Sequence, residues 1–155
     1  MKARIISALI LATILSGCSS QYDLRAINVD GEVAFVPEDK DIWGNPSPDC
    51  FYSISVSIID GPPATPASGD SVGMVGNGVY WHRSFAVTSC DNSFPITYGE
   101  ELQGPPFHED GQDEVGAKPL LPGFTYEVTA ASNGSEYGGG TFRLAEDGTV
   151  ESLAM

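Results

Sequence analysis

Residues 51–59 read FYSISVSII, and polar and apolar side chains alternate strictly along this stretch. In an extended chain, one face would carry the apolar residues Tyr52, Ile54, Val56 and Ile58. The opposite face would carry Ser53, Ser55 and Ser57. A period of two with one polar face is typical of a β-strand that buries one side against a core. This stretch therefore predicts a half-buried strand.

Further stretches of the chain also predict strands, at residues 32–36, 79–90, 124–131, 141–145 and 149–153. In the second of these, Trp81, Phe85 and Val87 are the expected inward residues. The last two are joined by a segment that contains Asp147-Gly148, a dipeptide that favours a tight hairpin. Residues 61–78 predict a long loop or a weak additional strand.

The whole pattern predicts an all-β domain. The chain contains 18 glycines and 11 prolines, which cluster between the expected strands. Beyond the first 17 residues, no stretch has the apolar period of a helix. Several short strands separated by turn signals favour a β-sandwich or an open barrel.

The segment LLPGFTY, residues 120–126, sharpens this prediction. It resembles the L-x-P-G-x-x-Y segment of fibronectin type III domains, in which a tyrosine hydroxyl bonds back to the upstream backbone. The resemblance implies that Tyr126 forms this tyrosine corner and that Leu120 packs beneath it. It also implies that residues 133–140 form a glycine-rich loop between the last two strands of the sandwich. We therefore expect a single antiparallel, immunoglobulin-like β-sandwich of about seven strands.

The start of the chain predicts export. Lys2 and Arg4 precede an uncharged apolar run over residues 5–15, which is too short to span a membrane as a helix. Residues 15–18 read LSGC, which resembles the lipobox of bacterial lipoproteins. That resemblance implies that Cys18 receives a diacylglyceryl group and becomes the new N-terminus. The alternatives are an ordinary signal peptide with an incidental cysteine and an N-terminal anchor helix that is never cleaved.

These features divide the chain into three parts. We expect a lipoprotein signal peptide at residues 1–17, a lipidated polar tether at residues 18–30 and the β-sandwich at residues 31–155. Ser19 follows the cysteine, which by resemblance to the sorting rule of enteric bacteria favours the outer membrane. The expected location is the bacterial cell envelope, with the lipid anchor holding the protein at the membrane.

The two remaining cysteines predict a disulfide. Cys50 and Cys90 form an even pair in an exported chain, and exported proteins meet an oxidising environment. The alternative is a two-cysteine metal site, which the spacing does not favour because the chain has no C-x-x-C motif.

The charge of the chain excludes one class of function. There are 21 acidic and 7 basic residues, a formal net charge of −14. Such a chain repels the phosphate backbone, so we expect no nucleic-acid partner. The excess of carboxylates indicates either a soluble, self-repelling surface or a surface for a cationic partner.

The acidic stretch at residues 108–114 (HEDGQDE) is a weak candidate calcium site, through Asp110, Asp113 and Glu114. The alternative is a solvated loop. Residues 39–44 begin like a calcium loop, but Trp43 stands where a ligand is required, so this second possibility fails.

We find no motif of an enzyme, and we predict no catalytic residue and no cofactor. His82 and His108 do not stand in a recognisable catalytic arrangement, and residues 76–78 (GNG) lack the following helix that a phosphate-binding loop needs. A possible aromatic platform for a sugar or a peptide comprises Trp43, Tyr80, Trp81 and Tyr137, although these residues could equally lie in the core.

The sequence therefore predicts a membrane-anchored, non-catalytic binding or assembly module. Its expected partners are an envelope protein or a glycan. The alternative is an envelope hydrolase or an inhibitor of an envelope enzyme.

Overall fold

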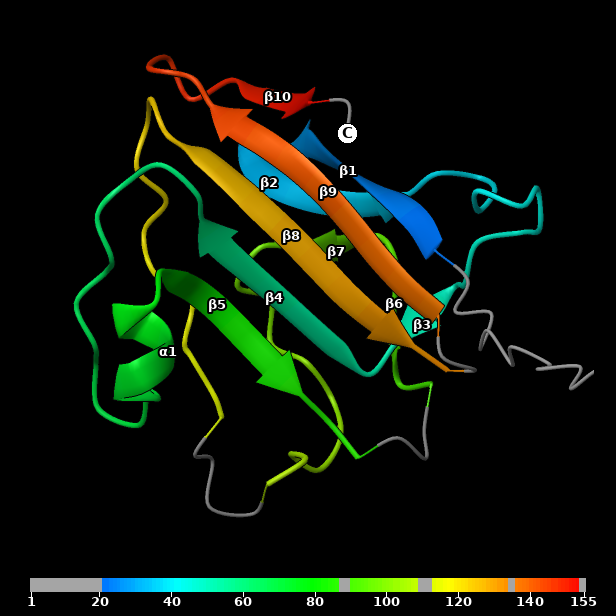
Figure 1. Cartoon of the computed structure of the whole chain (residues 1–155), viewed down its shortest axis with the longest axis horizontal. Helices are drawn as coiled ribbons and strands as arrows, with labels where there is room; N and C mark the ends of the chain where they lie inside the picture. The colour runs from blue at the N-terminus through cyan, green and yellow to red at the C-terminus, as the bar shows by residue number, and fades with distance from the viewer. Residues whose placement is uncertain (1–20, 87–89, 109–112, 134–135, 154–155) are drawn as a thin grey trace, which may run out of the picture.

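The computed structural model describes residues 21–86, 90–108, 113–133 and 136–153 (Figure 1). The strands are β1 (Gln21–Val29), β2 (Glu32–Pro37), β3 (Cys50–Phe51), β4 (Ser53–Ile58), β5 (Val79–Ser84), β6 (Asn92–Ser93), β7 (Ile96–Thr97), β8 (Thr125–Ser132), β9 (Glu136–Leu144) and β10 (Val150–Leu153). The described part of the chain has one short helix, α1 (Val72–Gly76). The predicted all-β, sandwich-like fold is confirmed.

Most strands belong to one curled sheet with the order β5-β4-β8-β9-β1-β2-β7, in which β10 also pairs with β9. The strand predicted from residues 51–59 is confirmed over residues 53–58, where Ile54 and Val56 are fully buried in β4. Tyr52, which we expected on the buried face, precedes β4 and is only partly buried. Phe51, the first residue of that stretch, belongs with Cys50 to β3, which pairs with β6 in a separate two-stranded sheet. The predicted hairpin at Asp147-Gly148 is also confirmed, since β9 and β10 pair antiparallel on either side of it.

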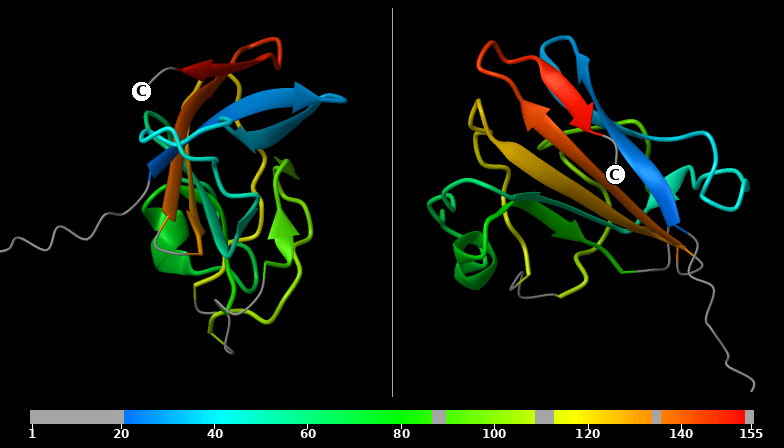
Figure 2. Two further views of the ribbon diagram at one scale, coloured as in Figure 1. Left: turned by 90° about the vertical axis from the view of Figure 1, so that its right-hand side faces the viewer. Right: turned by 45° about the horizontal axis from the view of Figure 1, so that its top comes forward.

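The curl of the sheet arises at β1, which pairs with two different strands. Residues 21–23 lie parallel to residues 137–139 of β9, whereas residues 24–29 lie antiparallel to β2. The sheet is therefore mixed. We predicted an antiparallel arrangement, and the parallel pairing of β1 with β9 is where the structure differs from it. In Figure 2, β1 and β2 cross away from β9 and form a second layer. The core lies between the layers and includes Phe35, Ile54, Val56, Tyr126, Val128 and Phe142.

Glycines in β9 permit this crossing. A Cβ atom at Gly140 would lie 1.9 Å from the carbonyl oxygen of Leu24, and one at Gly138 would meet the ring of Tyr22. The prediction of a glycine-rich loop over residues 133–140 is thus wrong for residues 136–140, which belong to β9. Their glycines serve the close approach of β1 and do not mark a turn.

The prediction of a tether over residues 18–30 is wrong for residues 21–29, which form β1. Tyr22, Leu24 and Ala26 are buried and alternate with exposed residues, so the strand has the same period of two as β4. The alternation was present in the sequence, where Asp23 and Arg25 occupy the exposed positions. Cys18 and the signal peptide lie outside the described residues.

The predicted tyrosine corner is confirmed. The Tyr126 hydroxyl accepts a hydrogen bond from the Leu121 N–H at 2.7 Å and donates one to the Leu121 carbonyl at 3.2 Å. Leu120 packs against the core. The ring of Tyr126 stacks on Phe142, with centroids 5.4 Å apart. This corner joins the loop before β8 to the centre of the core.

The predicted disulfide is also confirmed. Cys50 and Cys90 are bonded, with 5.5 Å between their Cα atoms. The bond links β3 to the segment before β6, and β3 and β6 also pair through their backbones.

Candidate functional site

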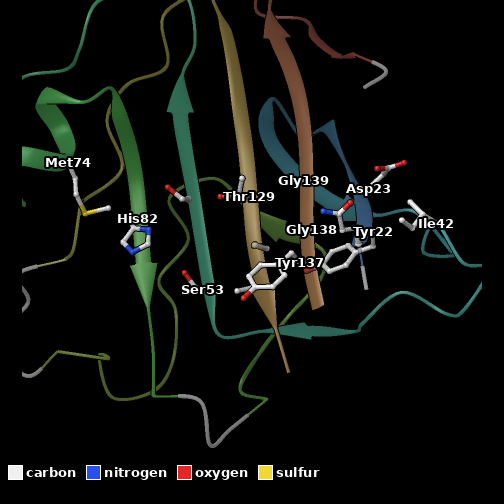
Figure 3. A pocket seen from close by; sticks show the side chains of 14 residues that line it. Tyr22, Asp23, Ile42, Ser53, Met74, His82, Thr129, Tyr137, Gly138 and Gly139 are labelled. Atoms are coloured by element: carbon white, nitrogen blue, oxygen red, sulfur yellow. The ribbon is translucent and has the colours of Figure 1, made fainter. Parts of the chain in front are cut away.

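A pocket of about 550 Å³ lies across the outer face of the sheet, over β5, β4, β8, β9 and β1 (Figure 3). We call it the trough. It is lined by Gln21, Tyr22, Asp23, Ile42, Ser53, Ser55, Met74, His82, Thr129, Ala130, Ala131, Tyr137, Gly138 and Gly139. Its volume lies in the range of natural ligand pockets.

Small side chains make the floor of the trough. The alternation of β4 turns Ser53 and Ser55 outward, while β8 contributes Thr129 and β9 contributes Gly139. Larger side chains close its ends. Figure 3 shows Met74 and His82 at one end and Ile42 at the other, with Tyr137 between them. The serine face of residues 51–59 and the proposed aromatic role of Tyr137 were the sequence signals for this surface.

Met74 is placed by a network that holds α1 against the sheet. Val75 of α1 is fully buried. The carboxylate of Asp70 forms a buried ion pair with Lys118 and accepts a hydrogen bond from the Gly116 N–H at 2.9 Å. Burial raises the pKa of Asp70, but these hydrogen bonds outweigh it and hold the pKa below its usual value. The Met74 end of the trough is therefore firmly supported.

Ile42 is placed by a tight loop at the other end. The carboxylate of Asp41 accepts hydrogen bonds from the backbone N–H groups of Trp43, at 2.9 Å, and Asn45, at 2.7 Å. The Ile42 N–H donates to the carbonyl of Gln21 at 3.1 Å. Residues 39–44, which we rejected as a calcium loop, thus use Asp41 to order their own backbone.

His82 is the one histidine in the trough. Its Nδ1 is buried and has no hydrogen-bond partner within the described residues. Burial lowers the pKa of His82, against the opposing charges of Asp113 and Glu114, so the imidazole is uncharged at neutral pH. An uncharged imidazole carries one donor nitrogen and one acceptor nitrogen.

The trough lacks the arrangement of a serine hydrolase. Ser55 faces His82 across the β4–β5 pairing, but in the described part of the chain no hydrogen bond joins them. Asp23 lines the trough from β1, at the far side of the sheet order from β5. Within the described residues, no carboxylate is therefore seen to orient the imidazole as a base for a serine.

The acidic stretch at residues 108–114 is only partly described, and Asp110 lies outside the described residues. Asp113 pairs with the Nε2 of His108 at 2.9 Å, and Glu114 pairs with Arg83. No group of three or more potential metal ligands occurs among the residues that the structure covers. A calcium site here stays a prediction.

The four aromatic residues predicted as a possible platform do not act together. Tyr80 and Trp81 are buried in the core. Tyr137 is 50% exposed and lines the trough, and Trp43 is 70% exposed on the loop beside Ile42.

Among the described residues, no helix is long and apolar enough to cross a membrane. The chain matches no protein-family model, no curated protein and no solved structure.

Proposed function

We propose that this protein is a non-catalytic binding module of the bacterial envelope, that acylated Cys18 anchors it, and that the trough binds its ligand. The trough carries the proposal, because it is a supported concave surface lined by several hydroxyl side chains, with no catalytic arrangement in the described residues. The alternative, an envelope hydrolase, would need an oriented base for Ser53 or Ser55. His82 lies opposite Ser55, but no hydrogen bond joins the two within the described residues.

The LSGC motif at residues 15–18 supports the anchor, and Ser19 supports an outer-membrane location. Two or more acyl chains give stable attachment, because each buried CH₂ contributes about 0.8 kcal/mol.

The topology supports an immunoglobulin-like sandwich. The consecutive neighbours β9, β8, β4 and β5 correspond to strands G, F, C and C′ of such a domain, and the tyrosine corner falls at the start of the strand that corresponds to F. Strands β1, β2 and β7 correspond to A, B and E. An immunoglobulin-like fold does not define a function, so we infer the class of ligand from the residues that line the trough.

The trough favours an uncharged glycan. Its polar groups are hydroxyls, an amide and the neutral His82, and Asp23 is the single charged residue among those that line it. Tyr137 offers a half-exposed ring on which a sugar can pack. An anionic ligand would be repelled by the net charge of −14.

A protein strand that extends the sheet is less suited to this side of the molecule. The outer edge of β5 is already covered, since His82 and Val115 exchange backbone hydrogen bonds at 3.0 Å. The Phe107 N–H also donates to the Ser84 carbonyl at 2.9 Å. These bonds occupy the groups that β-strand addition would use.

Binding of the acylated protein in detergent to a panel of neutral and charged oligosaccharides tests this proposal. Tyr137→Ala should weaken binding of a neutral glycan by about tenfold, the equivalent of about 1.4 kcal/mol. Ser55→Trp should abolish binding by filling the floor. Glu127→Gln is the matched control, because Glu127 is exposed on β8 but does not line the trough. Failure of every glycan to bind, or equal binding by all three variants, would contradict the proposal.

A further inference from the structure

Strand β1 starts very close to the proposed anchor. Only Ser19 and Ser20 separate Cys18 from Gln21, the first residue of β1. Three residue steps reach at most about 11 Å, even in a fully extended chain. The sheet therefore cannot be held far from the membrane surface if Cys18 is acylated.

An exposed apolar pair lies at this same end of the molecule. Ile42 is 58% exposed and Trp43 is 70% exposed. The value for Trp43 is the highest among the large hydrophobic side chains that the described surface exposes. Their loop is bonded to the start of β1, since the Ile42 N–H donates to the Gln21 carbonyl at 3.1 Å. In Figure 2, this loop and the start of β1 lie on the same side of the domain.

The loop is ordered before it meets any partner. Asp41 is buried and bonds the backbone N–H groups of Trp43 and Asn45, and the Asn45 side chain donates to Asp41 at 3.1 Å. Little conformational entropy is then lost on binding, because the backbone that carries the apolar pair is already held.

We propose that Ile42 and Trp43 insert into the lipid interface beside acylated Cys18 and dock the domain on the membrane. The proposal rests on the acylation of Cys18 and goes beyond the anchor itself. Tryptophan prefers the interface, where its ring is apolar and its N–H stays hydrated. The net charge of −14 means that an uncharged or zwitterionic lipid surface suits the protein better than an anionic one.

Docking through this loop also orients the trough. Ile42 lines one end of the trough and would lie at the membrane, whereas Met74 and His82 line the opposite end and would lie farther away (Figure 3). A ligand would then enter from the side, parallel to the membrane surface.

Tryptophan fluorescence of the acylated protein in phosphatidylcholine vesicles tests the proposal. The chain has two tryptophans, and Trp81 is buried in the core, so Trp43 is the one that can report contact with lipid. Vesicles should shift the emission to shorter wavelength, and brominated acyl chains should quench it. Trp43→Phe should remove both effects and leave the emission of Trp81. Ile42→Ser should reduce the quenching without unfolding the domain, because Ile42 is exposed.

The mass of the intact protein separates the possible failures. If Cys18 is acylated and brominated lipid leaves the emission unchanged, docking is overturned while the anchor and the trough proposal stand. If Cys18 carries no acyl group, the anchor and the docking proposal both fall, and glycan binding by the trough is still measured separately. Quenching that persists in Trp43→Phe would also overturn docking, since it would come from Trp81.

Discussion

Among single residues, Tyr126 connects the most parts of the structure. Its hydroxyl bonds both backbone groups of Leu121, and its ring contacts Tyr80 and Phe142. Because these contacts lie in the core, the side chain holds the loop before β8 to residues of β5 and β9.

We predict that Tyr126→Phe lowers the free energy of unfolding by about 1–3 kcal/mol, because the Leu121 N–H loses its acceptor while the ring stacking is kept. Urea unfolding followed by circular dichroism measures this change. Tyr137→Phe is the control, and it should change stability by no more than about 0.5 kcal/mol, because Tyr137 lies on the surface. An equal effect of the two substitutions would show that the corner does not stabilise the fold.

From the raised pKa of Tyr126 we also predict that the protein loses stability at alkaline pH. Burial raises the pKa of Tyr126 to about 12 from the ordinary value of 10.0, and burial raises the pKa of Tyr22 to about 12 as well. The unfolded chain therefore ionises first as the pH rises. The contribution of each neutral, buried tyrosine to the free energy of unfolding is therefore complete below pH 10. It is lost progressively towards pH 12, by about 1.4 kcal/mol per pH unit for each such tyrosine.

Melting temperatures from pH 8 to pH 12 check this prediction. The wild-type protein should lose stability steeply above pH 10, and Tyr126→Phe should lose it with a shallower slope because one titrating group is gone. Parallel slopes for the two proteins would contradict the assignment of this titration to Tyr126.

Among the elements, the crossing of β1 over β9 is the feature on which the sandwich depends. The Leu24 carbonyl occupies the space that a side chain at residue 140 would need. This crossing lets one strand serve both layers, because residues 21–23 pair with β9 and the rest of β1 pairs with β2.

We predict that Gly140→Ala destabilises the domain by about 3 kcal/mol, because the new methyl group must displace backbone rather than a flexible side chain. Gly73→Ala is a matched control in α1, where a Cβ atom meets nothing within 4 Å. That control should be neutral or stabilising by up to about 1 kcal/mol, since alanine favours a helix. Chemical denaturation of both variants measures the difference, and a stable Gly140→Ala protein would refute the tight crossing.

Much of the element structure could be predicted from local pattern. The alternation in residues 51–59, the Asp-Gly turn and the LLPGFTY segment each report contacts between residues that are close in sequence or on one face of a strand. The role of residues 136–140 could not be predicted in this way. A run of glycines is compatible with a loop or with a close approach of backbones, and the difference depends on Leu24, far away in the chain.

For the whole molecule, the disulfide is the one covalent link between distant segments of the described fold. Cys50 and Cys90 are separated by 40 residues, a span that contains β4, α1 and β5. Closing this span restricts the unfolded chain more than the folded one.

We predict that Cys50→Ser/Cys90→Ser lowers the free energy of unfolding by about 4 kcal/mol, by the loop-closure entropy of a span of this length. Guanidinium unfolding with and without a reductant measures the effect. The reductant should lower the midpoint of the wild-type protein to that of the double variant and should leave the double variant unchanged. An unchanged wild-type midpoint would contradict a stabilising disulfide.

The amino-acid pattern alone was enough to specify an all-β chain with a tyrosine corner, a terminal hairpin and one disulfide. The first three depend on residue types at short spacings, such as the serines that alternate with Ile54 and Val56. The disulfide was predicted from an even pair of cysteines in a chain with an export signal. The path of β1 and the trough required the folded chain. Gly140 must be small because Leu24 packs on it, and the trough is lined by residues as far apart as Gln21 and Gly139. Only the pairing of strands brings such residues onto one surface, because no local period encodes which strands become neighbours.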